Sequence, residues 1–352
     1  MGKKAKVHCL ACHHVFKKKW GEQKCPQCSS ETLVDEQDSK PPVAKSVEIK
    51  VGDSLLDTLA SDTSSAGSLH PSDGDRPLKK QKREGMPTSS QFPALLEAQQ
   101  ASKDILSRLM KIVTVVENTG KMFEFAINDI EKSDVIAVDC EAVCLSRTNA
   151  ITLIQVATKS HVYLFDIMKL KGNAFEAAHD AGRRSLKGCL ENPGITKLLF
   201  DCRRDSDSLF HQHDVSLKGV VDVQLLSVAA QRLMGQTVDR VDGFMKCSKR
   251  WLGRANVGGA LGVKDRVGAQ NNDEGNGALW GRRPLDMDAI RYAAADVLLL
   301  FPIQMAICSG LKEDMLRRVQ EASECRVAEY RDMIKALPQG VHDETASVAP
   351  SF

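Results

Sequence analysis

Residues 135–167 read VIAVDCEAVCLSRTNAITLIQVATKSHVYLFDI and hold three short apolar runs. The runs are Val135–Asp139, Ile151–Thr158 and Val162–Ile167, with a turn at Lys159–His161 between the last two. Short apolar runs rich in β-branched and aromatic residues and bounded by turns are typical of buried strands. This stretch therefore predicts three strands of a sheet.

Helical patterns alternate with strand patterns on both sides of this stretch. Lys121–Glu131 places four apolar residues at i, i+3, i+4 and i+7, which is helical spacing. The alternation predicts an α/β sheet domain. Residues 253–279 are rich in Gly and Asn, and we interpret them as a flexible insertion. Further strands are expected at Ile112–Val116, Lys197–Phe200 and Gly219–Val223, and helical patterns at Asp286–Ile307 and Leu311–Ile334.

Composition divides the 352 residues into four regions. Residues 1–34 hold paired cysteines, and residues 35–103 are rich in Ser, Asp, Pro and Gly. A segment such as SDTSSAGSLHPSDGDRP, residues 61–77, cannot bury enough apolar surface to offset its ordering entropy. We therefore expect a small N-terminal module, a disordered linker, an α/β domain over residues 104–335 and a disordered tail over residues 336–352.

Four of the eleven cysteines form two C-x2-C pairs that are twelve residues apart. Each pair can offer two sulfurs to one Zn²⁺, which takes four ligands in a tetrahedron. Because this segment has almost no apolar core, metal binding would supply its folding free energy. The pattern resembles a zinc ribbon, with adventitious cysteines as the alternative. The expected structural Zn²⁺ ligands are Cys9, Cys12, Cys25 and Cys28.

Basic charge gathers near the N-terminus, although the net charge of the chain is only +2. Residues 1–31 contain seven Lys and two Glu, an excess of +5. Such a segment suits a polyanionic partner such as nucleic acid. Two other interpretations stay open: the segment is a solvated, solubilising face, or the zinc ribbon or the linker docks a protein partner.

Neither a membrane span nor a secretory signal is expected from the sequence. The longest apolar stretch, around Val297–Ile307, is too short to cross a bilayer and contains Pro302. The first residues lead into charge and cysteine, unlike a secretory signal. Eleven cysteines without such a signal favour a reducing, intracellular compartment. Lys79–Arg83 (KKQKR) is typical of a nuclear localisation signal and favours the nucleus over the cytoplasm, with ordinary solvated charge as the alternative.

Several carboxylates stand where the pattern calls for burial or for a strand end. Asp139 and Glu141 are two apart on a strand, so both project from one face. Tyr292 and Asp296 are four apart and share one face of a helix, and Asp205 follows the KLLF strand. A buried carboxylate is costly unless it is paired or binds a cation. Hard oxygen ligands suit Mg²⁺ or Mn²⁺, so convergence of these groups would indicate a divalent cation site.

The same residues, in this order, resemble the 3′–5′ exonucleases of the DEDD superfamily, in the Tyr-containing (DEDDy) branch typified by ribonuclease D. The sequence around DCE and DCRRDSDSLF is most similar to that of Egalitarian-like exonuclease-domain proteins. The resemblance covers about residues 104–325. Its three motifs fall on Asp139 and Glu141 (D-x-E), on Asp205, eight residues after Lys197, and on Tyr292 and Asp296 (Y-x3-D).

The resemblance implies a ribonuclease H-like mixed sheet flanked by helices. It also implies metal-dependent hydrolysis that removes nucleotides from the 3′ end of RNA or DNA, with two Mg²⁺ or Mn²⁺ ions about 4 Å apart. Asp139 would bridge both ions and Asp205 would hold the second. Glu141 and Asp296 would hold the ion that carries the attacking water, and Tyr292 and Glu141 would orient that water.

Two departures from the family pattern bear on substrate contacts. Phe200 stands where relatives often carry a polar residue such as His, and the glycine-rich insertion before Trp280 is long. Asp201 and Asp207 flank Asp205, so a shift of register in the second motif stays open. The alternatives to an enzyme are a nucleic-acid-binding protein that kept the fold without catalysis, and a scaffold whose zinc ribbon docks proteins. The complete set of four carboxylates and the Tyr favours the enzyme.

Overall fold

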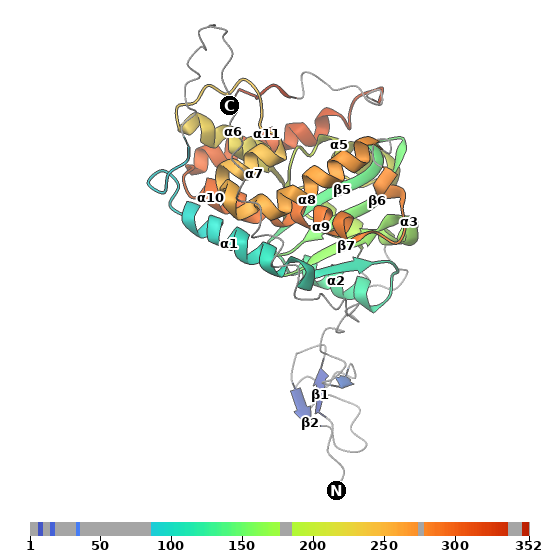
Figure 1. The fold of residues 1–352 in the computed structure, drawn as a ribbon. Coiled ribbons are helices and arrows are strands. Elements are labelled where there is room, and N and C mark those ends of the chain that lie inside the picture. The colour runs from blue at the N-terminus through green and yellow to red at the C-terminus, as the bar shows by residue number, and fades with distance from the viewer. Residues whose placement is uncertain are drawn as a thin grey trace, which may run out of the picture. The chain divides into compact units, whose positions relative to one another are not determined.

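The structure is a computed structural model that describes residues 6–9, 15–17, 33–35, 86–176, 185–273, 278–336 and 347–351. The chain divides into two compact units, Met1–Arg83 and Glu84–Phe352. In the first unit, β1 (Lys6–Cys9) pairs antiparallel with both β2 (Val15–Lys17) and β3 (Leu33–Asp35), as Figure 1 shows. The expected zinc ligands Cys12, Cys25 and Cys28, the side chain of Cys9 and the basic cluster Lys79–Arg83 lie outside the described residues. The zinc site therefore stays a prediction.

The second unit is built on a six-stranded mixed sheet in the order β4–β7–β6–β5–β8–β9. β5, β6 and β7 form an antiparallel meander, whereas β4 joins β7, β8 joins β5 and β9 joins β8 in parallel. The three strands predicted from residues 135–167 are confirmed, and β5 continues past Asp139 to Ser146. The strands are β4 (Val113–Val116), β5 (Val135–Ser146), β6 (Asn149–Ala157), β7 (Val162–Asp166), β8 (Thr196–Leu199) and β9 (Val220–Asp222).

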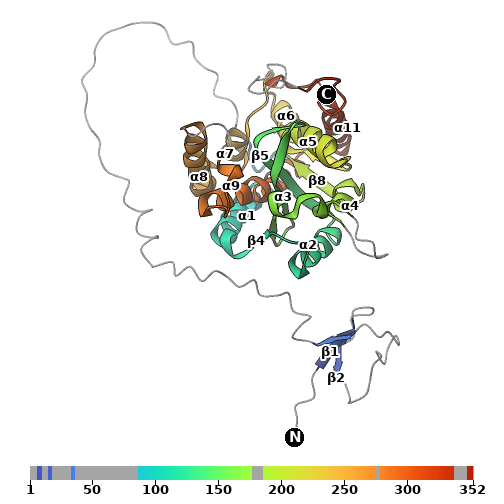
Figure 2. The ribbon, with the colours of Figure 1, turned by 90° about the vertical axis from the view of Figure 1, so that its right-hand side faces the viewer.

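Helices cover both faces of this sheet, which confirms the expected architecture (Figure 2). Successive strand residues point to opposite faces, so Leu164 joins one buried cluster and its neighbour Phe165 joins the other. The first face carries α1 (Leu95–Arg108), α6 (Val223–Leu233), α7 (Phe244–Leu252), α8 (Arg254–Asp273), α9 (Met287–Leu298) and α10 (Leu300–Cys308). The second carries α2 (Lys121–Glu131), α3 (Ile167–Leu170), α4 (Leu186–Glu191) and α5 (Arg203–His213).

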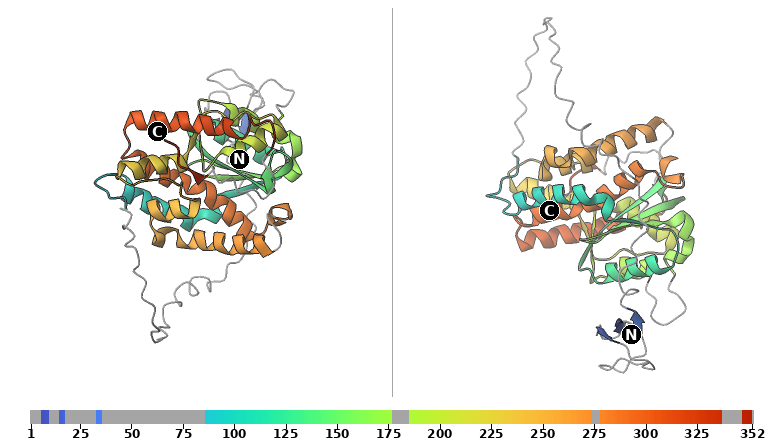
Figure 3. Two further views of the ribbon diagram at one scale, coloured as in Figure 1. Left: turned by 90° about the horizontal axis from the view of Figure 1, so that it is seen from above. Right: turned by 60° about the horizontal axis from the view of Figure 1, so that its bottom comes forward.

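The last long helix, α11 (Glu313–Glu329), lies at the β9 edge of the sheet. It contacts both α5 and α6, and it is the red helix in the left view of Figure 3. Two short 3-10 turns, Leu109–Lys111 and Lys171–Ala174, complete the connections before β4 and after α3. α11 thus bridges helices from the two faces of the sheet.

The prediction of a flexible insertion at residues 253–279 was wrong, because α8 occupies Arg254–Asp273. Each Gly costs a helix only about 1 kcal/mol relative to Ala, and burial of apolar side chains can exceed that cost. Val257 and Val267 are fully buried, in a helix that packs on α1, α7 and α9. Tertiary packing therefore overrides the local propensity of this glycine-rich segment.

The borders of the second unit also differ from the expected residues 104–335. The unit begins at Glu84, and the fully buried Phe92 packs edge-on against Trp251 with ring centroids 4.9 Å apart. At the other end, Val348 forms a β-bridge with Arg240 inside the segment expected to be a disordered tail. A few apolar anchors and backbone pairs at each end extend the folded unit beyond the boundaries that composition indicates.

The α9–α10 segment, Met287–Cys308, has the length and apolar composition of a membrane span, but 67% of the tested window is buried inside the fold. The two helices are separated at Leu299. Pro302 lacks an N–H group to donate to the carbonyl of Leu298, and this favours a break. The burial is that of a core helix pair packed on the sheet.

Candidate active site

β5 presents two of the predicted carboxylates toward α9. Its residues Ile136, Ala137 and Val138 are fully buried, which anchors the strand in the middle of the sheet. Because side chains alternate along a strand, Asp139 and Glu141 share the face of Ala137, which belongs to the cluster covered by α9. The D-x-E spacing therefore delivers both carboxylates to one side of the sheet.

α9 brings Tyr292 and Asp296 to the same place. The helix begins after Asp286, whose carboxylate accepts a hydrogen bond from the backbone N–H of Ala289 at 2.7 Å. Its central run AAA at residues 293–295 is buried, and these small side chains let the helix pack closely on β5, β6 and β7. Tyr292 and Asp296 are one turn apart, so they face the strand carboxylates together.

Asp139, Glu141 and Asp296 form a cluster in which one carboxylate oxygen from each lies within 4.8 Å of the others. They line a pocket of about 230 Å³ whose remaining wall is largely aromatic and apolar, from Phe200, Phe244, Tyr292 and Leu300. Carboxylates at this spacing repel one another. Oxygen donors gathered in this way fit a hard divalent cation such as Mg²⁺ or Mn²⁺.

Tyr292 lines the same pocket and keeps its proton. Burial raises the pKa of its phenol well above the ordinary value, and the negative charges of Asp296, Glu141 and Asp139 raise it further. Its ring packs edge-on against Trp280, with centroids 5.5 Å apart. The phenol is therefore a hydrogen-bond donor held beside the carboxylates, not a charged ligand.

Asp205 lies beside this cluster rather than within it. It occupies the first turn of α5, is 5% exposed, and hydrogen-bonds with Cys140, the residue between the two carboxylates of β5. Burial, followed by the charge of Asp201, raises the pKa of Asp205 to about 7. Among the described residues, its Oδ1 has no hydrogen-bond partner. A buried carboxylate oxygen without a donor is a position that a cation would satisfy.

The two aspartates that flank Asp205 are engaged elsewhere. Asp201 takes two hydrogen bonds from Arg203, at 2.6 and 2.9 Å. Asp207 pairs with Arg147 at 2.8 Å and also accepts the backbone N–H of Arg147. Since arginines already compensate both neighbours, the geometry favours Asp205 over either of them for the second motif.

A family model described as a 3′–5′ exonuclease matches residues 118–312, which is more than half of the chain. The chain belongs to this exonuclease family. The match confirms the resemblance to DEDD exonucleases at the level of the family, whereas the Tyr-containing branch and the zinc ribbon stay predictions.

Curated relatives of this chain include piRNA biogenesis protein EXD1 from Mus musculus. It is 26% identical over 241 residues, which cover 64% of this chain and 39% of the mouse protein. EXD1 from Bombyx mori is 30% identical over 139 residues, 39% of this chain and 42% of that protein. The Homo sapiens exonuclease mut-7 homolog is 28% identical over 162 residues, 45% of this chain and 18% of that protein. The match thus spans less than half of each relative.

Solved structures show the same fold. Trypanosoma brucei RNase D in complex with GMP superposes with a TM-score of 0.54 at 24% identity, covering 69% of this chain and 71% of that one. The complex of the same enzyme with RNA U12 superposes with a TM-score of 0.52 at 24% identity, covering 70% of this chain and 80% of that one. The second unit therefore has an RNase D-like exonuclease fold.

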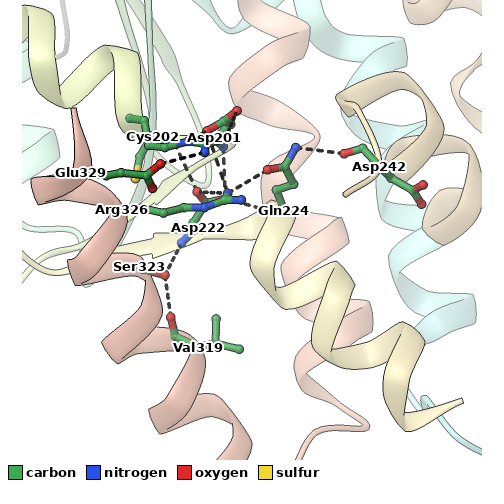
Figure 4. Close-up of polar contacts among 10 residues, drawn as sticks. Asp201, Cys202, Asp222, Gln224, Asp242, Val319, Ser323, Arg326 and Glu329 are labelled. Atoms are coloured by element: carbon green, nitrogen blue, oxygen red, sulfur yellow. Dashed lines mark hydrogen bonds and ion pairs between the residues drawn. The ribbon is translucent and has the colours of Figure 1, made fainter. Parts of the chain in front are cut away.

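A buried ion-pair network fixes the turn that leads into the second motif of this exonuclease-family chain (Figure 4). Asp222 is fully buried and accepts the backbone N–H groups of Asp201 at 3.1 Å and Cys202 at 3.3 Å. Arg326 from α11 donates to the same carboxylate at 2.8 Å and to the side-chain oxygen of Gln224 at 2.8 Å. Asp201 has a left-handed φ of 59°, so these hydrogen bonds stabilise a conformation that non-glycine residues rarely adopt.

Two other features near the site escaped sequence analysis. Gln155 of β6 lies directly opposite Asp139 in the strand register, with its Nε2 3.5 Å from Oδ2 of Asp139. The available signal was an amide side chain inside the largely apolar run ITLIQVA. Arg283 donates to Asp166 at 2.6 Å and to the carbonyl of Thr152 at 2.8 Å. This contact ties the segment that precedes α9 to β6 and β7.

Proposed function

We propose that this protein is a metal-dependent 3′–5′ exonuclease that removes nucleotides from the 3′ end of a nucleic acid. The observation that carries the proposal is the convergence of Asp139, Glu141 and Asp296 in one pocket, within a chain of the 3′–5′ exonuclease family. The three residues come from two segments more than 150 residues apart in the sequence, which makes a purely local cause of the cluster implausible.

The donor set fits Mg²⁺ or Mn²⁺. Asp139, Glu141 and Asp296 offer hard oxygen ligands to one cation, and the buried Oδ1 of Asp205 supports a place for a second cation next to Asp139. When bound, such a pair of cations neutralises the anionic phosphodiester and lowers the pKa of the attacking water. Asp139 adjoins Cys140, the residue of β5 that Asp205 contacts, and shares the carboxylate cluster with Glu141 and Asp296, so we assign it to both cations.

The other pocket residues would orient the reactants. Tyr292 remains protonated and would hold the attacking water by its hydroxyl group, as Glu141 would by its carboxylate. Phe200 and Phe244 pack edge to face with centroids 5.3 Å apart and form an aromatic part of the pocket wall. That wall would contact the sugar and base of the terminal nucleotide and exclude water from them.

We propose RNA as the substrate class. The support comes from the neighbours: two are RNase D structures, one of them in complex with RNA, and the EXD1 relatives are named for piRNA biogenesis. DNA is the competing substrate, since the described pocket residues do not include a feature specific to a 2′-hydroxyl group.

A second candidate function is nucleic-acid binding without cleavage. It is favoured by one observation, namely that Asp205 engages Cys140 and stays outside the cluster of three carboxylates. Phe200, in place of the polar residue that relatives often carry, points in the same direction. In this case the pocket would hold a 3′ end without hydrolysing it.

One assay separates the two functions. The purified chain is incubated with 5′-labelled RNA and with DNA of the same sequence, each in Mg²⁺, in Mn²⁺ or in EDTA, with Asp139→Asn as the matched control. We expect the wild type to shorten RNA stepwise from its 3′ end with either cation and not in EDTA. Retention of RNA without shortening in every condition would favour the binding protein instead.

For the N-terminal module we propose a structural Zn²⁺ held by Cys9, Cys12, Cys25 and Cys28. Chelation should remove one zinc per chain and unfold this module, while the thermal unfolding of the second unit stays unchanged, because the two are separate compact units. Absence of zinc from protein purified without chelators would contradict the site.

We also propose that Lys79–Arg83 directs the protein to the nucleus. The comparison is the cellular distribution of the tagged wild type and of a variant in which the four basic residues of this cluster are alanine. Equal distributions would contradict the proposal.

A further inference from the structure

Gln155 is a polar residue in an otherwise apolar row of the sheet. It is fully buried in β6, and its neighbours on the same face, Leu153 and Ala157, belong to the hydrophobic cluster under α9. Its direct cross-strand partner is Asp139. Directly opposed residues point to the same side of the sheet, so the amide lies next to the carboxylate that the proposed function makes most important.

Only half of this buried amide is satisfied. Nε2 lies 3.5 Å from Oδ2 of Asp139, at the outer limit of a hydrogen bond. Oε1 is buried and has no hydrogen-bond partner among the described residues. An unsatisfied buried acceptor costs about 1–3 kcal/mol, and Leu or Met of similar size would avoid that cost. The fold therefore carries a polar group here that does not serve its own stability.

The orientation of the amide follows from charge. Turned the other way, Gln155 would set its carbonyl oxygen against the carboxylate of Asp139, and two acceptors facing one another repel. With Nε2 toward Asp139, Oε1 is left as a buried acceptor without a donor among the described residues. A water molecule that accompanies a divalent cation carries the donor that this oxygen lacks, because Mg²⁺ keeps several waters when it binds to proteins.

We propose that Gln155 is a positioning residue of the acidic site. Its Nε2 holds Oδ2 of Asp139, and its Oε1 accepts a hydrogen bond from a water that enters with the divalent cation. A neutral donor suits this role: it orients the carboxylate without neutralising it, whereas the arginine on Asp222 cancels the charge. The inference rests on the proposed function, because it assigns a role toward the cation of that same site.

The decisive variant is Gln155→Met, which keeps the size of the side chain and removes both polar atoms. Residues that hydrogen-bond to metal ligands typically contribute 10–100-fold to metal affinity. We therefore expect Mn²⁺ affinity of the full chain, measured by calorimetry or by electron paramagnetic resonance, to fall about 10-fold or more. Without divalent cation, the variant should melt at the same temperature as wild type or higher, because a buried unsatisfied group is gone.

Gln231→Met is the matched control. Gln231 is also buried, but its Nε2 donates to the carbonyl and the hydroxyl oxygen of Ser227 within α6, at 3.2 Å each. This control should leave Mn²⁺ affinity unchanged. If Gln155→Met fails to fold, Gln155→Asn replaces it: the amide remains, but is one methylene too short to reach Asp139, and the same loss of affinity is expected.

The outcomes separate this inference from the proposed function. Mn²⁺ affinity within about twofold of wild type in a folded Gln155 variant overturns the positioning role, provided that Asp139→Asn does lose affinity. If wild type and Asp139→Asn bind Mn²⁺ equally, the proposed metal site itself is wrong. A purely structural role for Gln155 predicts a lower melting temperature with unchanged affinity, the reverse of the expected pattern.

Discussion

Two acidic regions of the second unit treat their carboxylates in opposite ways. Asp222, fully buried, pairs with Arg326 at 2.8 Å and accepts backbone N–H groups of the turn before α5. In the pocket between β5 and α9, the nearest charged neighbours of the carboxylates include one another: Asp139, Glu141 and Asp296 have oxygens within 4.8 Å. The first region compensates negative charge with an arginine, and the second accumulates it.

The difference separates a region that stabilises the fold from the region to which we assign the chemistry. A carboxylate held by an arginine and by backbone donors stabilises the fold, and removing one partner leaves an uncompensated buried charge. Three carboxylates brought together repel one another and lower stability until a cation binds. Neutral substitutions in the two regions should therefore act in opposite directions on stability, and only those in the pocket should act directly on chemistry.

The largest expected effect is that of Asp139→Asn on cleavage. Because this residue would serve both cations, we expect the rate of RNA shortening to fall by about 10⁴-fold or more, as for the central members of other catalytic groups. The melting temperature of the cation-free protein should stay the same or rise, since one of three repelling charges is removed. Activity near the wild-type level in a well-folded variant would refute the assignment of the pocket.

The second-largest expected effect is a loss of stability on substitution of Arg326. Arg326→Met removes the cation from Asp222, and we expect a loss of about 3–5 kcal/mol in the free energy of unfolding. The matched control is Arg317→Met on the exposed face of the same helix, where Arg317 pairs with Asp314 and Glu321. Solvent screens such exposed pairs, so the control should change the free energy of unfolding much less. Denaturant unfolding of both variants measures the contrast, and similar losses would erase the distinction between the two regions.

Tyr292→Phe should have a smaller effect on catalysis, which sharpens the division of roles inside the pocket. Orienting and acid–base groups contribute about 10²–10⁴-fold, and we expect about 10²-fold in the single-turnover rate, with Mn²⁺ affinity unchanged. Asp296→Asn should also raise the Mn²⁺ concentration required, because it removes a ligand. A Phe variant within about twofold of wild type would mean that Tyr292 only packs against Trp280.

Local sequence patterns predicted correctly those elements in which the spacing of the apolar residues already determines the buried face. Lys121–Glu131 was predicted as a helix and α2 has those bounds, because the four apolar positions of its i, i+3, i+4, i+7 pattern are the buried ones. α8 was missed because Val257 and Val267 are buried in a helix that packs on three others, one of which, α1, is distant in the sequence. No local property of a glycine-rich segment reveals that packing.

The same limit applies to the site. The spacing of two along β5 and of four along α9 was enough to group Asp139 with Glu141 and Tyr292 with Asp296. The place of Gln155 depends on the register between β5 and β6, and a single sequence does not specify that register. The position of Asp205 beside the cluster depends on the left-handed turn at Asp201, which a network with distant partners holds.

Lys197 adds a third way to bury a charge, and it gives the smallest of the predicted effects. It is fully buried in β8, and its Nζ donates to the carbonyls of Asn192 at 2.5 Å and Ile195 at 2.8 Å, with no carboxylate among these partners. Burial lowers its pKa to about 8, against about 10.4 for a free side chain.

Between these two values the unfolded state binds more protons than the folded state, so stability should rise with pH through this window. The full difference between the two pKa values of Lys197 would correspond to roughly 3 kcal/mol in the free energy of unfolding. The two carbonyls favour the charged amine, however, and we expect a gain of about 1–2 kcal/mol for wild type over Lys197→Met between about pH 7 and pH 10. Urea unfolding of both proteins across this range measures it, and the comparison with Met removes the contributions of other groups that titrate there. If the free energies of unfolding of wild type and Lys197→Met change in parallel with pH, Lys197 stays charged in the fold. Backbone carbonyls can then replace a carboxylate as partners of a buried cation.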